Sequence, residues 1–205
     1  MRVTVIDYGA GNLTSVVKAF RHLGAEVEVN DTPASLAISN RIVLPGVGHF
    51  AATSRLDESG ITPAVRAAIA RGIPFLGVCV GMQWLYSAST EAPACLGLAH
   101  FSESCTRFPD AAEKVPHVGW NSLRVLPESR LLSGIQPGAY VYFTHSYKAP
   151  VTAATAAITE YIEPFASAVE SSNVMGVQFH PEKSGETGLR ILRNFLEWQP
   201  METKC

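Results

Sequence analysis

The first 80 residues alternate between short apolar segments and longer segments with helical periodicity. The short segments are rich in β-branched residues, as buried strands are, and they are residues 3–7, 27–29, 41–44 and 73–78. Residues 13–23 and 61–70 instead repeat apolar side chains every three or four positions, and a glycine that would end a helix follows each of them closely. Strands that alternate with helices predict an α/β fold with a mostly parallel, open sheet flanked by helices.

After residue 100 the pattern changes to strand-like segments joined by turns. These are residues 118–126, 139–144, 153–159, 165–170 and 174–179, and a last helical pattern covers residues 185–198. Consecutive strands joined by short turns pair antiparallel, so we expect antiparallel strands added to a flavodoxin-like fold in the C-terminal half. No repeat or linker interrupts the pattern, which predicts a single domain over residues 1–205.

The composition argues against several classes of function. The chain has 16 basic and 18 acidic residues and a formal net charge of −2, whereas a nucleic-acid-binding surface needs an excess of positive charge. No apolar run reaches the roughly 18 residues of a membrane span, and we find no secretory signal. We therefore expect a cytoplasmic protein that binds neither nucleic acid nor membranes. Its cysteines form no C-x-x-C pair and predict no metal site; they are Cys79, Cys95, Cys105 and Cys205.

The motif G-V-C-V-G at residues 77–81 follows a predicted strand. A nucleophile between two glycines at this point is typical of an elbow, a sharp turn from strand into helix that exposes the side chain at the carboxyl end of the sheet. Cys79 would lie at the start of a helix near Met82, where the positive end of the helix dipole favours the thiolate. Taken alone, the motif also fits a buried cysteine in a glycine-rich turn.

The segment Q-F-H-P-E at residues 178–182 places an imidazole and a carboxylate two positions apart. On an extended backbone, His180 and Glu182 would point to the same side. A carboxylate beside an imidazole fixes its tautomer and stabilises the imidazolium, which is what a general base for a cysteine nucleophile needs. The alternative is a solvated pair at the end of a strand.

A third motif, L-P-G-V-G at residues 44–48, follows another predicted strand. Its glycines allow the backbone to approach a ligand closely. Backbone amides of Val47 or Gly48, together with that of Val80, could form an oxyanion hole. The alternative is a tight turn. Residues 9–11 lack the third glycine of a dinucleotide-binding motif, and no G-x-S-x-G serine elbow occurs.

Together these motifs resemble the class I, or triad, glutamine amidotransferases, in which a cysteine elbow precedes an H-x-E pair. The matching blocks are D-Y-G-A-G-N-L (7–13), L-P-G-V-G (44–48), G-V-C-V-G-M-Q (77–83), V-P-H-V-G-W-N (115–121), Y-F-T-H-S-Y (142–147) and G-V-Q-F-H-P-E-K-S (176–184). The P-H-x-G-W-N block is typical of the branch that serves imidazole glycerol phosphate synthase. It is absent from the glutaminases of anthranilate and aminodeoxychorismate synthases. Val80 and Thr144 depart from that branch, in which leucine and valine are usual.

The resemblance implies that Cys79 is the nucleophile, His180 the general base and acid, and Glu182 the residue that orients His180. The residues it implies for the oxyanion hole are Val47, Gly48 and Val80. Those it implies for the amino-acid end of glutamine are Gln83, His145, Ser146 and Tyr147. The resemblance further implies that the mouth facing a partner protein is marked by Asn12 and Lys183.

The implied activity is hydrolysis of L-glutamine to L-glutamate and ammonia through a cysteine thioester, without a metal or organic cofactor. The ammonia would pass to a (β/α)₈-barrel cyclase subunit, in a heterodimer that serves histidine biosynthesis and yields a purine intermediate. Three alternatives stay open. The chain could be a glutaminase of the same fold that feeds another synthase, a non-catalytic regulatory module that kept the fold, or a general cysteine hydrolase.

Overall fold

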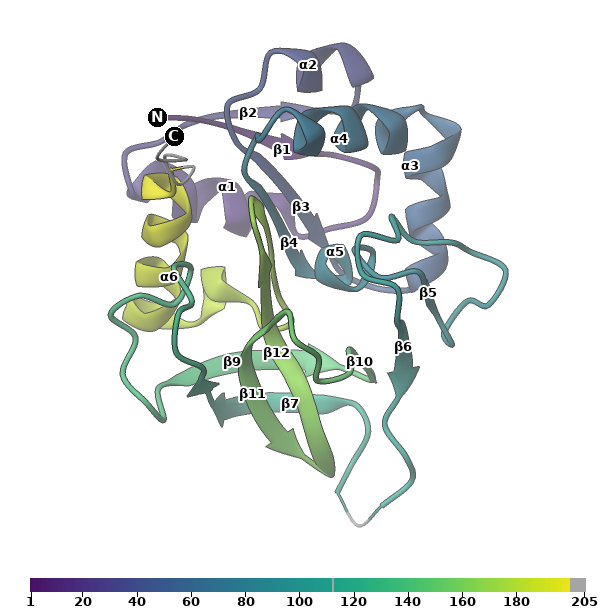
Figure 1. Cartoon of the computed structure of the whole chain (residues 1–205), viewed down its shortest axis with the longest axis vertical. Helices are drawn as coiled ribbons and strands as arrows, with labels where there is room; N and C mark the ends of the chain where they lie inside the picture. Colours follow the sequence, from purple (N-terminus) through teal and green to yellow (C-terminus); the bar gives the residue numbers. More distant parts are fainter. Residues whose placement is uncertain (112, 200–205) are drawn as a thin grey trace.

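The computed structural model describes residues 1–111 and 113–199. An eight-stranded sheet forms its centre, in the order β2–β1–β3–β4–β13–β12–β11–β8 (Figure 1). The parallel strands are β1 (Arg2–Ile6), β2 (Glu26–Asn30), β3 (Ile42–Gly46), β4 (Phe75–Cys79) and β13 (Val174–Val177). The antiparallel strands that extend the sheet are β12 (Glu163–Ser171), β11 (Thr155–Tyr161) and β8 (Arg124–Val125). The predicted fold, a parallel sheet with added antiparallel strands, is confirmed.

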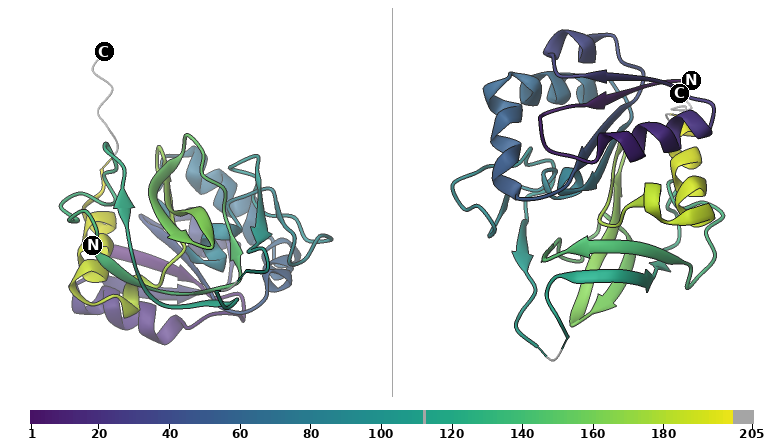
Figure 2. Two further views of the ribbon diagram at one scale, coloured as in Figure 1. Left: turned by 90° about the horizontal axis from the view of Figure 1, so that it is seen from below. Right: turned by 180° about the vertical axis from the view of Figure 1, so that it is seen from behind.

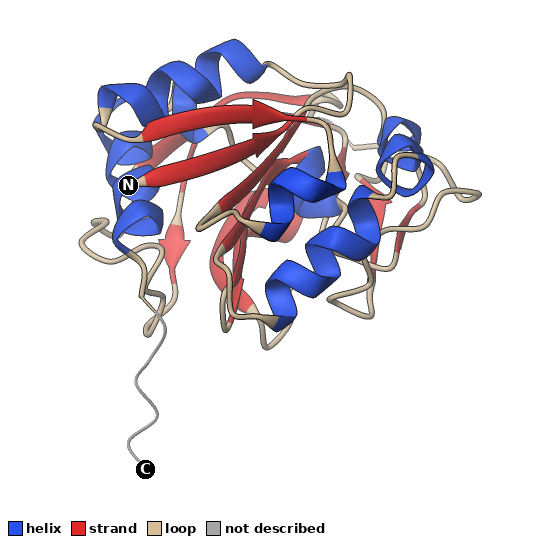
Figure 3. Cartoon of the chain, turned by 90° about the horizontal axis from the view of Figure 1, so that it is seen from above, coloured by secondary structure: helices blue, strands red, loops and turns tan. Residues whose placement is uncertain are grey.

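Helices cover both faces of this sheet (Figure 2, Figure 3). One face carries α1 (Leu13–His22) and α6 (Gly185–Glu197); the other carries α2 (Pro33–Ala37), α3 (Ser54–Glu58) and α4 (Ile61–Ala70). Because both faces are covered, every residue of β3, β4 and β13 is buried. The predicted helices over residues 13–23, 61–70 and 185–198 are thus confirmed to within a residue at each end. None of the helices in residues 1–111 and 113–199 is long and apolar enough to cross a membrane.

Within the described residues, two smaller sheets lie beside the main one. One is the antiparallel pair of β7 (His117–Ser122) and β9 (Tyr140–His145), which crosses β11 and β12 in Figure 1. The other is the three-stranded sheet of β5 (Ala88–Ser89), β6 (Ser104–Arg107) and β10 (Tyr147–Lys148). These sheets carry the residues that close the far side of the pocket described below.

The prediction of one strand over residues 118–126 is wrong. The chain leaves the small sheet after Ser122 and joins the main sheet at Arg124, so two strands in different sheets replace one. Leu123 between them is fully buried, and its backbone N–H and C=O bond to Ala139 and Gly138 rather than to a strand neighbour. The need to bury this one side chain breaks the strand.

Candidate active site

Cys79 is the last residue of β4, and the one-turn helix α5 (Val80–Gln83) begins directly after it. Its backbone has φ 55° and ψ −111°, a strained conformation for a residue other than glycine. A Cβ atom on Gly77 would lie 2.4 Å from the carbonyl oxygen of Gly81, and one on Gly81 would lie 1.9 Å from that of Leu44. Both glycines that flank Cys79 are therefore required, because a side chain at either position would overlap neighbouring backbone atoms. The helix begins two residues earlier than expected and has only one turn, so its dipole supports a thiolate weakly.

His180 and Glu182 form a buried pair next to the sheet. His180 Nδ1 lies 2.9 Å from Glu182 Oε1, and both side chains are almost fully buried. The expectation of an extended backbone is wrong, because β13 ends at Val177 and Glu182 lies in a 3₁₀ turn, η2 (Pro181–Lys183). Pro181 has the fixed φ that suits the first position of such a turn, and the turn carries the carboxylate back to the ring.

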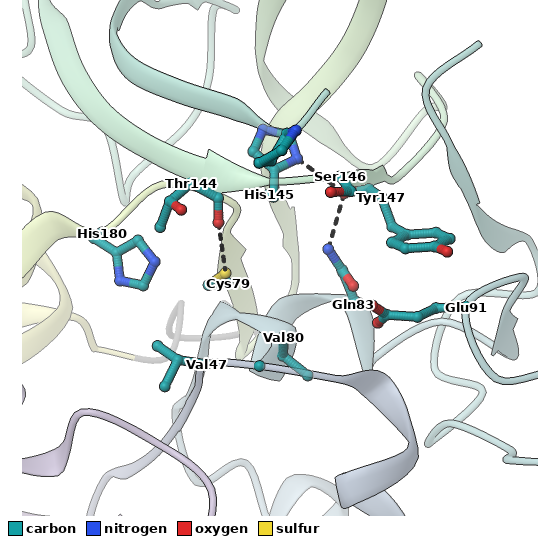
Figure 4. Close-up of a pocket in the computed structure, with 12 residues that line it drawn as sticks. Val47, Cys79, Val80, Gln83, Glu91, Thr144, His145, Ser146, Tyr147 and His180 are labelled. Carbon is teal, nitrogen blue, oxygen red and sulfur yellow. Dashed lines mark hydrogen bonds between the residues drawn. The ribbon is translucent and has the colours of Figure 1, made fainter. Parts of the chain in front are cut away.

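A cavity of about 270 Å³ opens at the carboxyl ends of β3 and β4 (Figure 4). The candidate residues that line it are Val47, Gly48, Cys79, Val80, Gln83, His145, Ser146, Tyr147 and His180. Glu182 is not among them, because it lies on the far side of the imidazole from the cavity. Three lining residues were not anticipated: Glu91, Pro116 and Thr144.

Cys79 and His180 both line the cavity, and the imidazole ring of His180 points toward the sulfur of Cys79 (Figure 4). His180 Nε2 is buried and has no hydrogen-bond partner among the residues that the structure describes. Burial by itself lowers the pKa of His180, but the neighbouring Cys79 and Glu182 outweigh it and raise that pKa to about 9. A proton on this imidazole at neutral pH is therefore favoured by a carboxylate on one side and by sulfur on the other.

Two of the residues expected to hold a ligand are already committed to protein contacts. Gln83 Nε2 donates to Tyr147 O at 2.9 Å and to Gln178 Oε1 at 3.0 Å, which leaves only its side-chain oxygen for a ligand. Both ring nitrogens of His145 are occupied, by Tyr147 O at 2.9 Å and by His117 at 3.1 Å. Burial lowers the pKa of His145 to about 3, so the ring is neutral. Any contact of His145 with a ligand would have to come from its backbone.

Glu91 is one of the three lining residues that the sequence does not predict. It lines the cavity near Gln83, and its Oε2 accepts a hydrogen bond from the backbone N–H of Phe50 at 2.8 Å. It is the one acidic side chain on the described cavity wall. Glu91 belongs to no sequence motif, because it lies in a turn after β5. Only the packing of this turn against Phe50 brings its carboxylate to the site.

Asn12 and Lys183 lie outside the cavity. A crevice too narrow for a water molecule shares Val47 and His180 with the cavity and is lined by Asn12 and Glu182. Lys183 is exposed, and its Nζ lies 5.7 Å above the ring of Tyr142 on β9. Cys95 and Cys105 lie away from the cavity lining, and Cys205 lies outside the described residues. Within the described residues, no group of His, Cys, Asp and Glu could hold a metal ion.

Comparison with known proteins identifies relatives over nearly the whole chain. The family model described as "Glutamine amidotransferase class-I" matches residues 4–198. The chain is 43% identical to the imidazole glycerol phosphate synthase subunit HisH of Methanosarcina acetivorans, over 96% of this chain and 98% of that protein. It is 46% identical to the HisH subunit of Dechloromonas aromatica, over 97% of both.

Solved structures with low sequence identity share the fold. A glutamine amidotransferase superimposes with a TM-score of 0.75 at 21% identity, over 95% of this chain and 97% of that one. PurLQS from Thermotoga maritima superimposes with a TM-score of 0.75 at 18% identity, over 96% and 97%. At this identity the likeness concerns the arrangement of helices and strands.

Proposed function

The chain belongs to the class I glutamine amidotransferase family, and we propose that it acts as the glutaminase subunit of imidazole glycerol phosphate synthase through the cavity at Cys79. One observation carries the proposal: His180 turns one edge of its ring toward Cys79 (Figure 4), while its Nδ1 on the other edge lies 2.9 Å from Glu182 Oε1. This is the arrangement in which a base accepts the proton of a nucleophile while a carboxylate holds its tautomer.

The reaction starts from the state in which the Cys79 proton has passed to His180 Nε2, a state that the raised pKa of His180 favours at neutral pH. The thiolate attacks the side-chain carbonyl carbon of glutamine, and the backbone amides of Val47 or Gly48 and of Val80 meet the oxyanion. His180 then protonates the leaving nitrogen, so ammonia departs and a thioester remains. A water molecule, whose proton passes to His180, hydrolyses the thioester to glutamate and restores the thiol.

The walls of the cavity suit the amino-acid end of glutamine. Glu91 can accept a hydrogen bond from the α-ammonium group, and the side-chain oxygen of Gln83 can accept a second one. The described lining contains neither lysine nor arginine, so the α-carboxylate has to bind hydroxyl and backbone N–H groups, both of which Ser146 offers.

A partner cyclase subunit belongs to this function, and an exposed aromatic face beside the cavity supports its docking there. Val118 and Trp120 on β7 and Tyr140 on β9 are each more than half exposed. Tyr142, which pairs with Trp120, and Thr144, which lines the cavity, continue this face along β9. We propose that this face and the neighbouring Asn12 and Lys183 meet a (β/α)₈-barrel cyclase, which receives the ammonia.

Two further expectations, the domain organisation and the cellular location, remain proposals. Because the main sheet takes strands from both ends of the chain, β1 and β13, residues 1–205 are proposed to form one glutamine amidotransferase domain. A cytoplasmic location, without binding of nucleic acid or membranes, stays a prediction.

Ammonia release from glutamine by wild type and Cys79→Ala, with and without a cyclase subunit and its nucleotide ligand, tests the function. We expect release by the wild type with the liganded cyclase and none by Cys79→Ala. Cys95→Ala is the matched control, since that cysteine lies outside the cavity lining, and it is expected to behave as wild type. Normal release by Cys79→Ala would refute the role of the nucleophile, and release that ignores the cyclase would point to another synthase.

A further inference from the structure

Cys79 has a second polar neighbour besides His180, and the mechanism above leaves it unused. Gln178 follows β13 and is fully buried, and its Nε2 lies 3.7 Å from Cys79 Sγ, as a donor. Gln178 is not part of the cavity lining. It therefore contacts the sulfur without contacting a bound glutamine.

The direction of the Gln178 amide is fixed by a chain of hydrogen bonds that starts at the backbone carbonyl of Tyr147. A carbonyl only accepts, so the Gln83 atom that lies 2.9 Å from it is the amide nitrogen. The second hydrogen of this nitrogen points to Gln178, 3.0 Å away, which must present its oxygen there. The other atom of the Gln178 amide, next to sulfur, is then the N–H donor.

The hydrogen bonds from Tyr147 O through Gln83 to Gln178 form one arm of a network. A second arm of hydrogen bonds ends at the same carbonyl and holds it in place. His145 Nδ1 donates to Tyr147 O at 2.9 Å, so His145 Nε2 accepts from His117 Nδ1 at 3.1 Å. His117 Nε2 then accepts from Asn121 Nδ2 at 3.4 Å. Burial lowers the pKa of His117 to about 4 and that of His145 to about 3, so both rings are neutral and this arm is intact at neutral pH.

The ring of His117 is itself held by packing. It lies between Tyr161, whose ring centroid is 3.9 Å away, and Phe143, at 4.8 Å, and both rings are nearly parallel to it. Gln83 and His145 each donate to the Tyr147 carbonyl, so both of its lone pairs are used. Along both arms, each nitrogen and oxygen can act only as the donor or only as the acceptor named above.

We infer that Gln178 is a further catalytic residue of this site, whose amide N–H holds the Cys79 sulfur and stabilises its thiolate, with Gln83 and His145 as positioning residues. The inference rests on the proposed function in that Cys79 is the nucleophile. When the thiol proton moves to His180 Nε2, the electron pair stays on sulfur. Thr144 O, 4.0 Å away, only accepts and so favours the thiol, whereas the Gln178 N–H only donates and so favours the thiolate.

The substitution Gln178→Glu tests this, because it keeps the shape and the oxygen that Gln83 contacts but replaces the N–H by an acceptor. The readout is the rate at which iodoacetamide alkylates Cys79 in the full chain, followed by mass spectrometry from acid to alkaline pH. We expect the rate at neutral pH to fall about ten- to a hundredfold, the range of a hydrogen bond to a charged group, and the midpoint of the pH profile to rise. The kcat for glutamine should fall in parallel while KM stays the same, since Gln178 does not line the cavity.

Asn194→Asp is the matched control. It makes the same change from amide to acid at a buried side chain that donates to Leu131 and Ser133, away from the cavity, and should leave alkylation of Cys79 unchanged. Gln178→Met, which removes the N–H without adding charge, is the second variant and should slow alkylation in the same direction. Should neither Gln178 variant fold, the wild type decides: the side-chain amide resonances of ¹⁵N-labelled Gln178 are expected to shift when Cys79 is alkylated.

The inference is overturned if either folded Gln178 variant alkylates at the wild-type rate with the wild-type pH profile, or if the amide resonances do not move. Alkylation needs neither glutamine nor a cyclase, so it reports on Gln178 independently of the proposed function. A wild type that releases no ammonia, yet shows alkylation that depends on Gln178, would refute the proposed function alone.

Discussion

Gly81→Ala separates two effects that work in opposite directions at the elbow. Gly81 lies in α5 with an ordinary backbone conformation, so helix propensity alone predicts that alanine stabilises the chain by about 1 kcal/mol. The space around it predicts the reverse. A Cβ atom would lie 1.9 Å from the carbonyl oxygen of Leu44 and 2.9 Å from its carbonyl carbon, whereas ordinary contacts begin at 3.4 Å.

The distance that the backbone must move gives the size of the expected loss of stability. The backbone must open by roughly 1.5 Å to bring the 1.9 Å contact to 3.4 Å, and neither side is soft, since Leu44 lies fully buried in β3 between two parallel strands. Overpacking costs about 1–3 kcal/mol, and an overlap this deep takes the upper end. After subtraction of the roughly 1 kcal/mol that alanine gains in helix propensity, we expect a net loss of about 2 kcal/mol, or about 4–8 °C in Tm for a chain of this length. Displacing Cys79 by about 1 Å should also lower kcat by roughly a hundredfold.

Thermal unfolding checks the loss of stability, and the kcat for glutamine with the liganded cyclase checks the displacement of Cys79. Gly11→Ala is the matched control: its φ is not positive, and its Cβ would meet Pro45 O at an ordinary 3.6 Å, so we expect a change of no more than about 0.5 kcal/mol. If Gly81→Ala unfolded at the wild-type temperature and turned over glutamine with the wild-type kcat, the spatial explanation of the G-x-C-x-G motif would be wrong.

Three further predictions concern the polar groups of the site. Glu182→Gln should lower kcat by about 10³- to 10⁴-fold in a glutamate-release assay, because the tautomer of His180 is no longer fixed, and an unchanged kcat would contradict the role of Glu182. The folded pKa of His180, about 9, lies above its ordinary value of 6.5, so its stabilising contribution is complete below pH 6.5 and is lost as the pH rises through 9. Denaturant unfolding should therefore show a fall in stability over this range that is smaller in Glu182→Gln; an equal fall would refute the coupling. Glu91→Gln should raise the KM for glutamine about tenfold or more with a smaller effect on kcat, and an unchanged KM would remove Glu91 from the ammonium site.

The local parts of the fold follow from the sequence. Periodicity identifies α1, α4 and α6 and the buried parallel strands, because each of these elements buries one face or both along its own length. The α-helices and strands that the periodicity does not reveal are α2, α3, β5, β6 and β10, of two to five residues each, which are too short to show a period. The break at Leu123 was also missed, because the strand pattern continues through it and only the position of the core interrupts the pairing.

The candidate site likewise has a part that local sequence motifs reveal and a part that only packing brings together. Cys79 between two glycines, the glycines after β3 and the pair of His180 and Glu182 are all local motifs, so the residue types alone point to nucleophilic chemistry. Even there, the route by which Glu182 reaches His180 is a 3₁₀ turn rather than an extended strand.

The set of reactive groups and the order of the elements that carry them can therefore be read from the residues alone. Which groups meet depends on the packing: Glu91 lies at the cavity, Gln178 contacts the sulfur, and His145 bonds to His117 rather than to a ligand. The difference comes from the range over which the interactions act. Backbone propensity and apolar periodicity act within a few residues, whereas the direction of a buried hydrogen bond depends on donors and acceptors that packing brings together from distant parts of the chain.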